Sequence, residues 1–61
     1  MKRADLERHL RRHGCQLKRE GANHAIWEKS AREIWSSVPR HREVKEFLVR
    51  KICRQLEIPT P

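Results

Sequence analysis

The sequence has few cysteines, glycines and aromatic residues, on which many small enzymes and disulfide-stabilised domains depend. Its 61 residues include two cysteines, two glycines, one phenylalanine and no tyrosine. Cys15 and Cys53 are far apart and form no C-x-x-C pair, so we expect buried thiols rather than a disulfide. No serine or cysteine lies in a motif typical of a catalytic nucleophile, no glycine-rich loop precedes a helix, and no pair of carboxylates is spaced for acid–base catalysis. Any catalysis would therefore depend on histidine.

Long hydrophobic runs are also absent. No segment approaches the roughly 20 apolar residues that span a bilayer, and no hydrophobic signal region follows Met1. We therefore expect a soluble, cytoplasmic protein without membrane contact. A chain of this length forms one domain, residues 1–61, and buries only about 60% of the surface that its unfolded form exposes. The core must be thin.

Acidic residues are outnumbered. Eight Asp and Glu face fifteen Lys and Arg, which gives a net charge of +7 and a pI near 10.5. Such an imbalance favours a polyanionic partner, and nucleic acid is the first candidate. An acidic protein is the second.

Two segments have helical periodicity. Leu6 and Leu10 lie four residues apart among charged residues, which predicts an amphipathic helix over residues 2–13 that ends at Gly14. A second helix is predicted over residues 42–56 and must end before Pro59. Its apolar stripe consists of Val44, Leu48, Val49, Ile52, Cys53 and Leu56.

Three segments between these helices alternate like strands. Residues 15–20 should direct Cys15 and Leu17 inward. Residues 24–29 form the second strand, residues 30–32 a polar connection, and residues 33–38 a third strand ended by Pro39. Alternation in the third strand leaves Trp35 exposed. The predicted fold is α+β in the order α-β-β-β-α, a three-stranded antiparallel sheet with two helices on one face.

The turn before the second strand carries the main functional candidate. Gly21 can take a positive φ and Asn23 tolerates turn geometry, so a short hairpin connection should place His24, half-exposed, at the start of the second strand. An imidazole there can give or take a proton near neutral pH. Its face is open: Ile26 inward would turn His24 inward, and Trp27 inward would turn it outward. An ordinary surface histidine is the alternative.

Other residues could bind phosphate or metal. Arg40, His41 and Arg42 precede the second predicted helix, where free N–H groups and cations could form a phosphate cradle. Lys18 and Arg19 could extend the same basic surface, and an exposed tryptophan could stack on a base. His9 and His13 have the spacing of a zinc-protease helix but lack its glutamate and a third ligand, so we predict no metal site.

Four segments together resemble one family, the HicA family of bacterial toxin–antitoxin modules. They are residues 5–14, ending in Leu10-Arg11-Arg12-His13-Gly14; residues 19–27, Arg-Glu-Gly-Ala-Asn-His-Ala-Ile-Trp; Val38-Pro39-Arg40-His41; and Ile52-Cys53-Arg54-Gln55-Leu56. The resemblance covers nearly the whole chain. The chain departs from the family pattern at Ala22, where a glycine is common, and at residues 29–33, which lack the usual Pro or Gly.

The resemblance implies a fold similar to double-stranded-RNA-binding domains and metal-independent cleavage of messenger RNA without a cofactor. It implies that His24 is the essential catalytic residue, that a HicB antitoxin is the partner, and that His41 has a structural or phosphate-binding role. We therefore predict an endoribonuclease in which His24 transfers a proton. The predicted RNA contacts are Lys18, Arg19, Asn23, Arg40, His41 and Arg42. A non-catalytic RNA-binding module is the alternative, followed by an interaction domain for an acidic protein.

Overall fold

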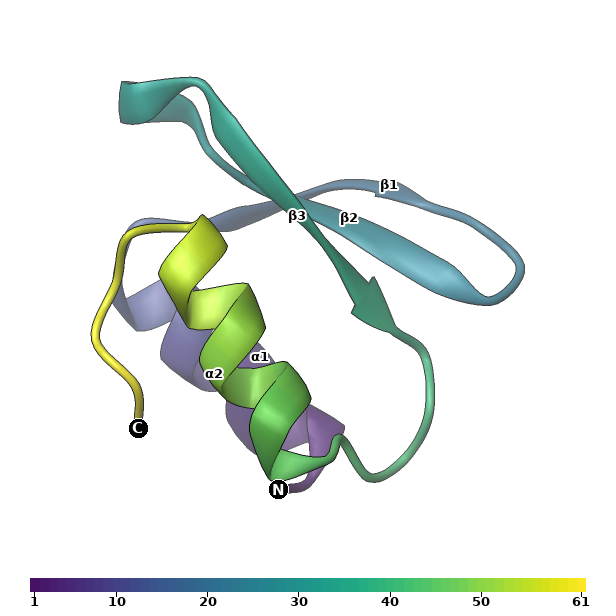
Figure 1. Cartoon of the computed structure of the whole chain (residues 1–61). Helices are drawn as coiled ribbons and strands as arrows, with labels where there is room; N and C mark the ends of the chain where they lie inside the picture. The colour runs from purple at the N-terminus through teal and green to yellow at the C-terminus, as the bar shows by residue number, and fades with distance from the viewer.

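The computed structural model describes all 61 residues and has the predicted order of helix, three strands and helix (Figure 1). The elements are α1 (Arg3–Arg12), β1 (Gln16–Glu20), β2 (His24–Lys29), the short 3-10 helix η1 (Ser30–Arg32), β3 (Ile34–Pro39) and α2 (Glu46–Gln55). The sheet is antiparallel in the order β1-β2-β3. Both helices lie on the same side of it (Figure 1). The predicted α+β class and topology are confirmed.

The two faces of the sheet differ because only one is covered by the helices. Directly paired residues point to the same face; the pairs Ala25↔Val38 and Trp27↔Ser36 are buried. Trp27 is fully buried, its Nε1–H has no hydrogen-bond partner, and the Arg11 guanidinium lies 4.9 Å from its ring centroid. The opposite face of β2 and β3 remains open.

Helix α1 forms as its periodicity predicts. Leu6 and Leu10 are both completely buried, one turn apart on the face toward the sheet. The helix ends where expected, because Gly14 takes a left-handed φ of 84° that other residues adopt at a cost.

Helix α2 begins later than predicted, at Glu46 instead of residue 42. The segment before it is extended and pairs with the segment before α1: the Arg3 N–H donates to the Arg42 carbonyl at 2.9 Å and the Val44 N–H to the Met1 carbonyl at 2.7 Å. Val44 is still buried, but from this extended segment and not from a helix. The predicted end is confirmed, since the helix ends at Gln55, before Pro59.

The strands need two corrections. Leu17 lies opposite Trp27, on the covered face, yet it is 42% exposed because β1 is an edge strand that the helices do not fully cover. Pro39 does not stop β3 but is its last residue, paired with His24. The exposure of Trp35 is confirmed.

The core is a single cluster of buried residues between the sheet and the two helices. Both cysteines belong to it as free thiols, and burial raises the pKa of Cys15 and of Cys53 above the ordinary thiol value of 9.0. Neither helix has the length and apolar character needed to cross a bilayer.

Candidate active site

His24 is the first residue of β2 and is exposed, as predicted from the turn before it. The three-residue connection Gly21–Asn23 is closed by the Gly21 N–H, which donates to the His24 carbonyl at 2.7 Å. Gly21 does not use the positive φ that we expected. A Cβ at this position would lie 3.0 Å from the His24 carbonyl oxygen, so the close approach of the two backbones is what favours glycine here.

The orientation left open by the sequence is now determined. Trp27 and Ala25 are buried against the helices, so His24 and Ile26, which alternate with them, belong to the other face of β2. The His24 side chain makes no hydrogen bond within the chain. Both ring nitrogens are therefore available to a ligand.

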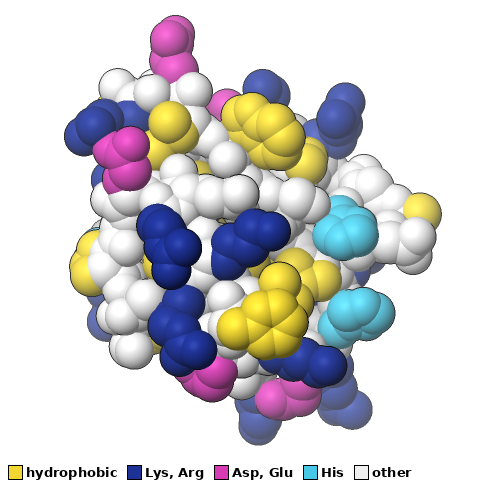
Figure 2. Space-filling model, in the orientation of Figure 1, with side chains coloured by type: hydrophobic (Ala, Val, Ile, Leu, Met, Phe, Trp, Pro, Cys, Tyr) yellow, Lys and Arg dark blue, Asp and Glu magenta, His cyan; other side chains and the backbone are white.

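His24 lines a groove at the junction of the sheet edge and α2. The groove has a volume of about 380 Å³, and its polar lining consists of His24, Ser37, His41, Lys51 and Gln55, with Pro39, Leu48 and Ile52 as its apolar wall. The side chains of His41 and Lys51 make no hydrogen bond or ion pair within the chain. Figure 2 shows two histidine side chains close together at the edge of a face on which Lys and Arg side chains gather. Two imidazoles and one ammonium group thus share one open groove.

Gln55 is held in the groove by a buried partner. The Ser36 hydroxyl donates to the Gln55 side-chain oxygen at 2.6 Å, and Ser36 is almost completely buried on the covered face of β3. This contact leaves the amide N–H groups of Gln55 free to donate. The groove therefore combines proton-transfer groups with donors suited to an anion.

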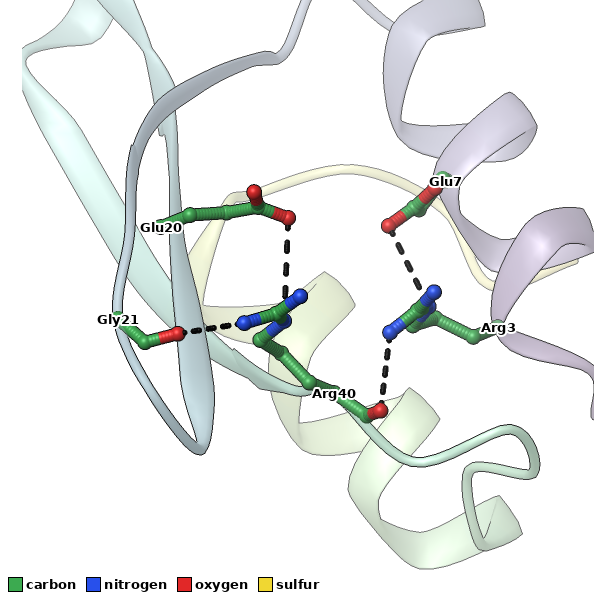
Figure 3. A network of polar contacts seen from close by, with 5 residues as sticks. All are labelled: Arg3, Glu7, Glu20, Gly21 and Arg40. Carbon is green, nitrogen blue, oxygen red and sulfur yellow. Dashed lines mark hydrogen bonds and ion pairs between the residues drawn. The ribbon is translucent and has the colours of Figure 1, made fainter.

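Arg40 connects the hairpin turn with the segment that follows β3 (Figure 3). Its Nη1 donates to the Gly21 carbonyl at 2.8 Å and its Nε lies 3.8 Å from the Glu20 carboxylate. The Arg40 carbonyl accepts from Arg3 Nη1 at 2.9 Å, and Arg3 is paired with Glu7 of α1. This chain of contacts ties α1 to the turn that precedes His24.

The prediction that Arg40, His41 and Arg42 lie at the start of a helix was wrong. Arg40 and His41 lie before the extended segment and Arg42 lies within it. All three precede Glu46 by several residues, so the free N–H groups of α2 are not beside them. Only His41 of these three lines the groove of His24. Arg42 instead lines a hollow formed with Lys2 and Arg3.

The remaining predicted contacts surround the turn or lie on the open face. The Asn23 backbone carbonyl accepts from the Arg40 N–H at 3.1 Å, and the exposed Asn23 side chain makes no hydrogen bond. Lys18 and Arg19 line a hollow on the open face of the sheet together with Ile26 and Trp35.

Sequence reasoning missed Lys51, Gln55 and Ser37 as groove residues. A signal was present, because Leu48, Lys51 and Gln55 are spaced three and four residues apart and share a helix face. Periodicity could not show that this face borders the end of β2, since that depends on how α2 crosses the sheet.

His9 and His13 stand apart from this groove. Their rings lie 4.5 Å apart, so the two side chains do share a helix face. His9 Nε2 is 2.6 Å from the Pro59 carbonyl, which gives this ring a structural contact. No group of three potential metal-ligating side chains occurs in the chain.

Comparison with known proteins gives one match. The family model described as "HicA toxin of bacterial toxin-antitoxin" matches residues 3–58 of the 61. No curated protein and no solved structure matches the chain. The match includes both helices, all three strands and every polar residue of the groove.

Proposed function

Because this chain belongs to the HicA family of bacterial toxin–antitoxin toxins, we propose that it is an endoribonuclease that cleaves messenger RNA with His24 as its catalytic residue. The observation that carries the proposal is the groove in which an unbonded, exposed His24 faces the same space as His41 and Lys51. Exposure matters because a proton-transfer group must reach the scissile linkage of a large substrate.

RNA carries its own nucleophile, so the protein needs to supply little chemistry. The 2′-oxygen forms a bond to the adjacent phosphorus while the bond from phosphorus to the 5′-oxygen breaks. The 2′-hydroxyl loses one proton and the departing 5′-oxygen gains one, leaving a 2′,3′-cyclic phosphate and a 5′-hydroxyl. His24 transfers one of these protons, as a base toward the 2′-hydroxyl or as an acid toward the 5′-oxygen.

The other groove residues support this step. Lys51 and the Gln55 amide group stabilise the negative charge that grows on the phosphoryl oxygens. His41 binds the same phosphate as a hydrogen-bond donor. Further contacts to the RNA backbone come from Lys18, Arg19, Asn23, Arg40 and Arg42, in keeping with the net charge of +7.

Regulation follows from the family, whose toxins are paired with antitoxins. We propose that a HicB-type antitoxin in the cytoplasm inhibits this toxin by covering the groove of His24. Its contact surface should be acidic, because the toxin surface around the groove is basic.

The test is cleavage of a labelled messenger RNA in EDTA by the wild type, His24→Ala and the control His13→Ala. His13 directly follows α1 and does not line the groove. General acid–base catalysis contributes about 10²- to 10⁴-fold, so His24→Ala should cleave at least a hundredfold more slowly, with an unchanged melting temperature and RNA affinity. His13→Ala should cleave like the wild type.

Two results would contradict the proposal. Wild-type cleavage by purified His24→Ala would remove His24 from the mechanism. A salt-sensitive shift of RNA without fragments, for the wild type itself, would instead identify a non-catalytic RNA-binding module.

A further inference from the structure

Trp35 is unusual among the large apolar residues because it lies on the uncovered face of the sheet. It is 59% exposed, whereas Trp27 on the neighbouring strand is fully buried. Trp35 lines a hollow of about 420 Å³ with Ile26, Lys18 and Arg19. An aromatic ring flanked by two cations is therefore open to solvent.

Shared lining residues relate this hollow to the groove of His24. A second hollow on the other side of Trp35 is lined by Ser37 and Gln55, and these two residues also line the groove of His24. Trp35 is four residues along β3 from Pro39, the partner of His24. At about 3.3 Å per strand residue, the separation is about 13 Å. A few nucleotides of an extended strand cover such a distance.

The charges around Trp35 favour an anionic ligand. Arg19 has no ion pair, and Lys18 has one contact, at 3.9 Å from the Glu28 carboxylate. Because the Lys18 side chain is 58% exposed, this contact is weak and can be exchanged for a phosphate. A strand of RNA alternates phosphates with flat bases, which matches two cations beside an exposed indole ring.

We propose that Trp35 is a stacking site for an unpaired base of the RNA bound at His24, with Lys18 and Arg19 holding the adjacent phosphates. The proposal rests on the ribonuclease function above and adds a substrate class, single-stranded RNA. A base in a duplex hides both of its faces between its neighbours, so it cannot stack on Trp35. A partner protein that covers Trp35 is the competing occupant, and the experiment separates the two.

The experiment measures binding of a fluorescently labelled single-stranded RNA in a His24→Ala background, which prevents cleavage. The variants are Trp35→Ala and Trp35→Phe, with Phe47→Ala as the matched control because Phe47 is also 59% exposed but lies on α2. Trp35→Ala should bind about tenfold more weakly, in the range that base stacking contributes. Trp35→Phe should retain most of the affinity, and Phe47→Ala should match its parent.

Two further readouts do not respond to a merely structural role. Single-stranded RNA should quench the tryptophan fluorescence of the parent, and Trp35→Ala should lose this quenching because Trp27 is buried. The same RNA annealed to its complement should bind Trp35→Ala and its parent equally. Circular dichroism of Trp35→Ala checks that the fold is retained.

The inference is overturned if Trp35→Ala binds single-stranded RNA as tightly as its parent. It is also overturned if the substitution weakens only the complex with the antitoxin, since the open face is then a protein contact. Cleavage by the chain with Trp35 intact is measured separately. If that chain binds RNA through Trp35 but does not cleave it, the ribonuclease proposal fails and the stacking site remains.

Discussion

Arg40 offers the sharpest test of how the fold serves the groove, because two roles for it predict opposite results. As an RNA contact it needs only its positive charge. As a positioning residue it needs the guanidinium shape, since Nη1 donates to the Gly21 carbonyl while Nε faces Glu20. Lysine retains the charge but cannot reproduce this pair of contacts.

The magnitude follows from the two contacts. A hydrogen bond from a charged donor contributes about 1.5–3 kcal/mol when sheltered, and an exposed ion pair about 0–1 kcal/mol. Because the Arg40 side chain is 39% exposed, we take the lower end of these ranges, so the two contacts together stabilise the turn by about 1–2 kcal/mol. The Gly21–His24 hydrogen bond still closes the turn, so the turn is loosened rather than lost. At 1.4 kcal/mol per tenfold change, cleavage should fall about tenfold.

The assay compares single-turnover cleavage and RNA affinity for Arg40→Lys, Arg40→Ala and the control Arg32→Ala, which loses an ion pair to Glu57 away from the groove. Positioning predicts that both Arg40 variants cleave about tenfold more slowly while Arg40→Lys keeps its RNA affinity. An Arg40→Lys variant that cleaves like the wild type would refute the positioning role. Arg40 would then act as an RNA contact only, and Arg40→Ala should reduce the slope of log affinity against log salt concentration by about 0.7, the loss of one phosphate contact on a single strand.

Two further predictions concern stability. Burial raises the pKa of Cys15 and Cys53 above 9.0, so the thiols of the unfolded chain lose their protons at a lower pH than those of the folded chain. The folded state should therefore lose stability as the pH rises above about 9. A Cys15→Ala, Cys53→Ala variant whose melting temperature falls equally at alkaline pH would contradict this cause. Glu33 has a φ of 54°, a conformation that costs residues other than glycine about 1–2 kcal/mol. Glu33→Gly should therefore raise the urea concentration at the midpoint of unfolding. A lowered midpoint would show that the turn is not strained.

Local signals in the sequence predicted most of the fold. Leu6 and Leu10 identify α1, Gly14 ends it, and the alternation of β3 separates Ser36 from Trp35. The errors came from partners distant in the chain. Nothing local indicates that Arg42–Val44 would pair with Met1–Arg3 and delay α2, and no periodicity distinguishes an edge strand, where Leu17 stays exposed, from a central one.

The candidate site was predictable to a similar limit. The hairpin turn identified His24 because glycine and asparagine have local conformational preferences, but the choice between its two faces depended on which of Ile26 and Trp27 is buried by the helices. Lys51 reaches the groove only through the crossing of α2 over the sheet. Residues of a site that come from one turn can be predicted from sequence, whereas those contributed by a second element depend on packing.

Because the core lies on one side of the sheet, the same strands carry buried residues on one face and candidate site residues on the other. Two short helices can cover only one face of three strands, so large residues on that face, Trp27 above all, carry the fold. A Trp on the opposite face gains little from burial, because Trp35 remains 59% exposed. About 25 cal/mol is gained for each Å² of apolar surface removed from water. The exposed part of the Trp35 ring contributes nothing to folding in this way, so a ligand that covers it gains this free energy on binding. A ligand that enters at His24 and extends along β3 meets that surface next.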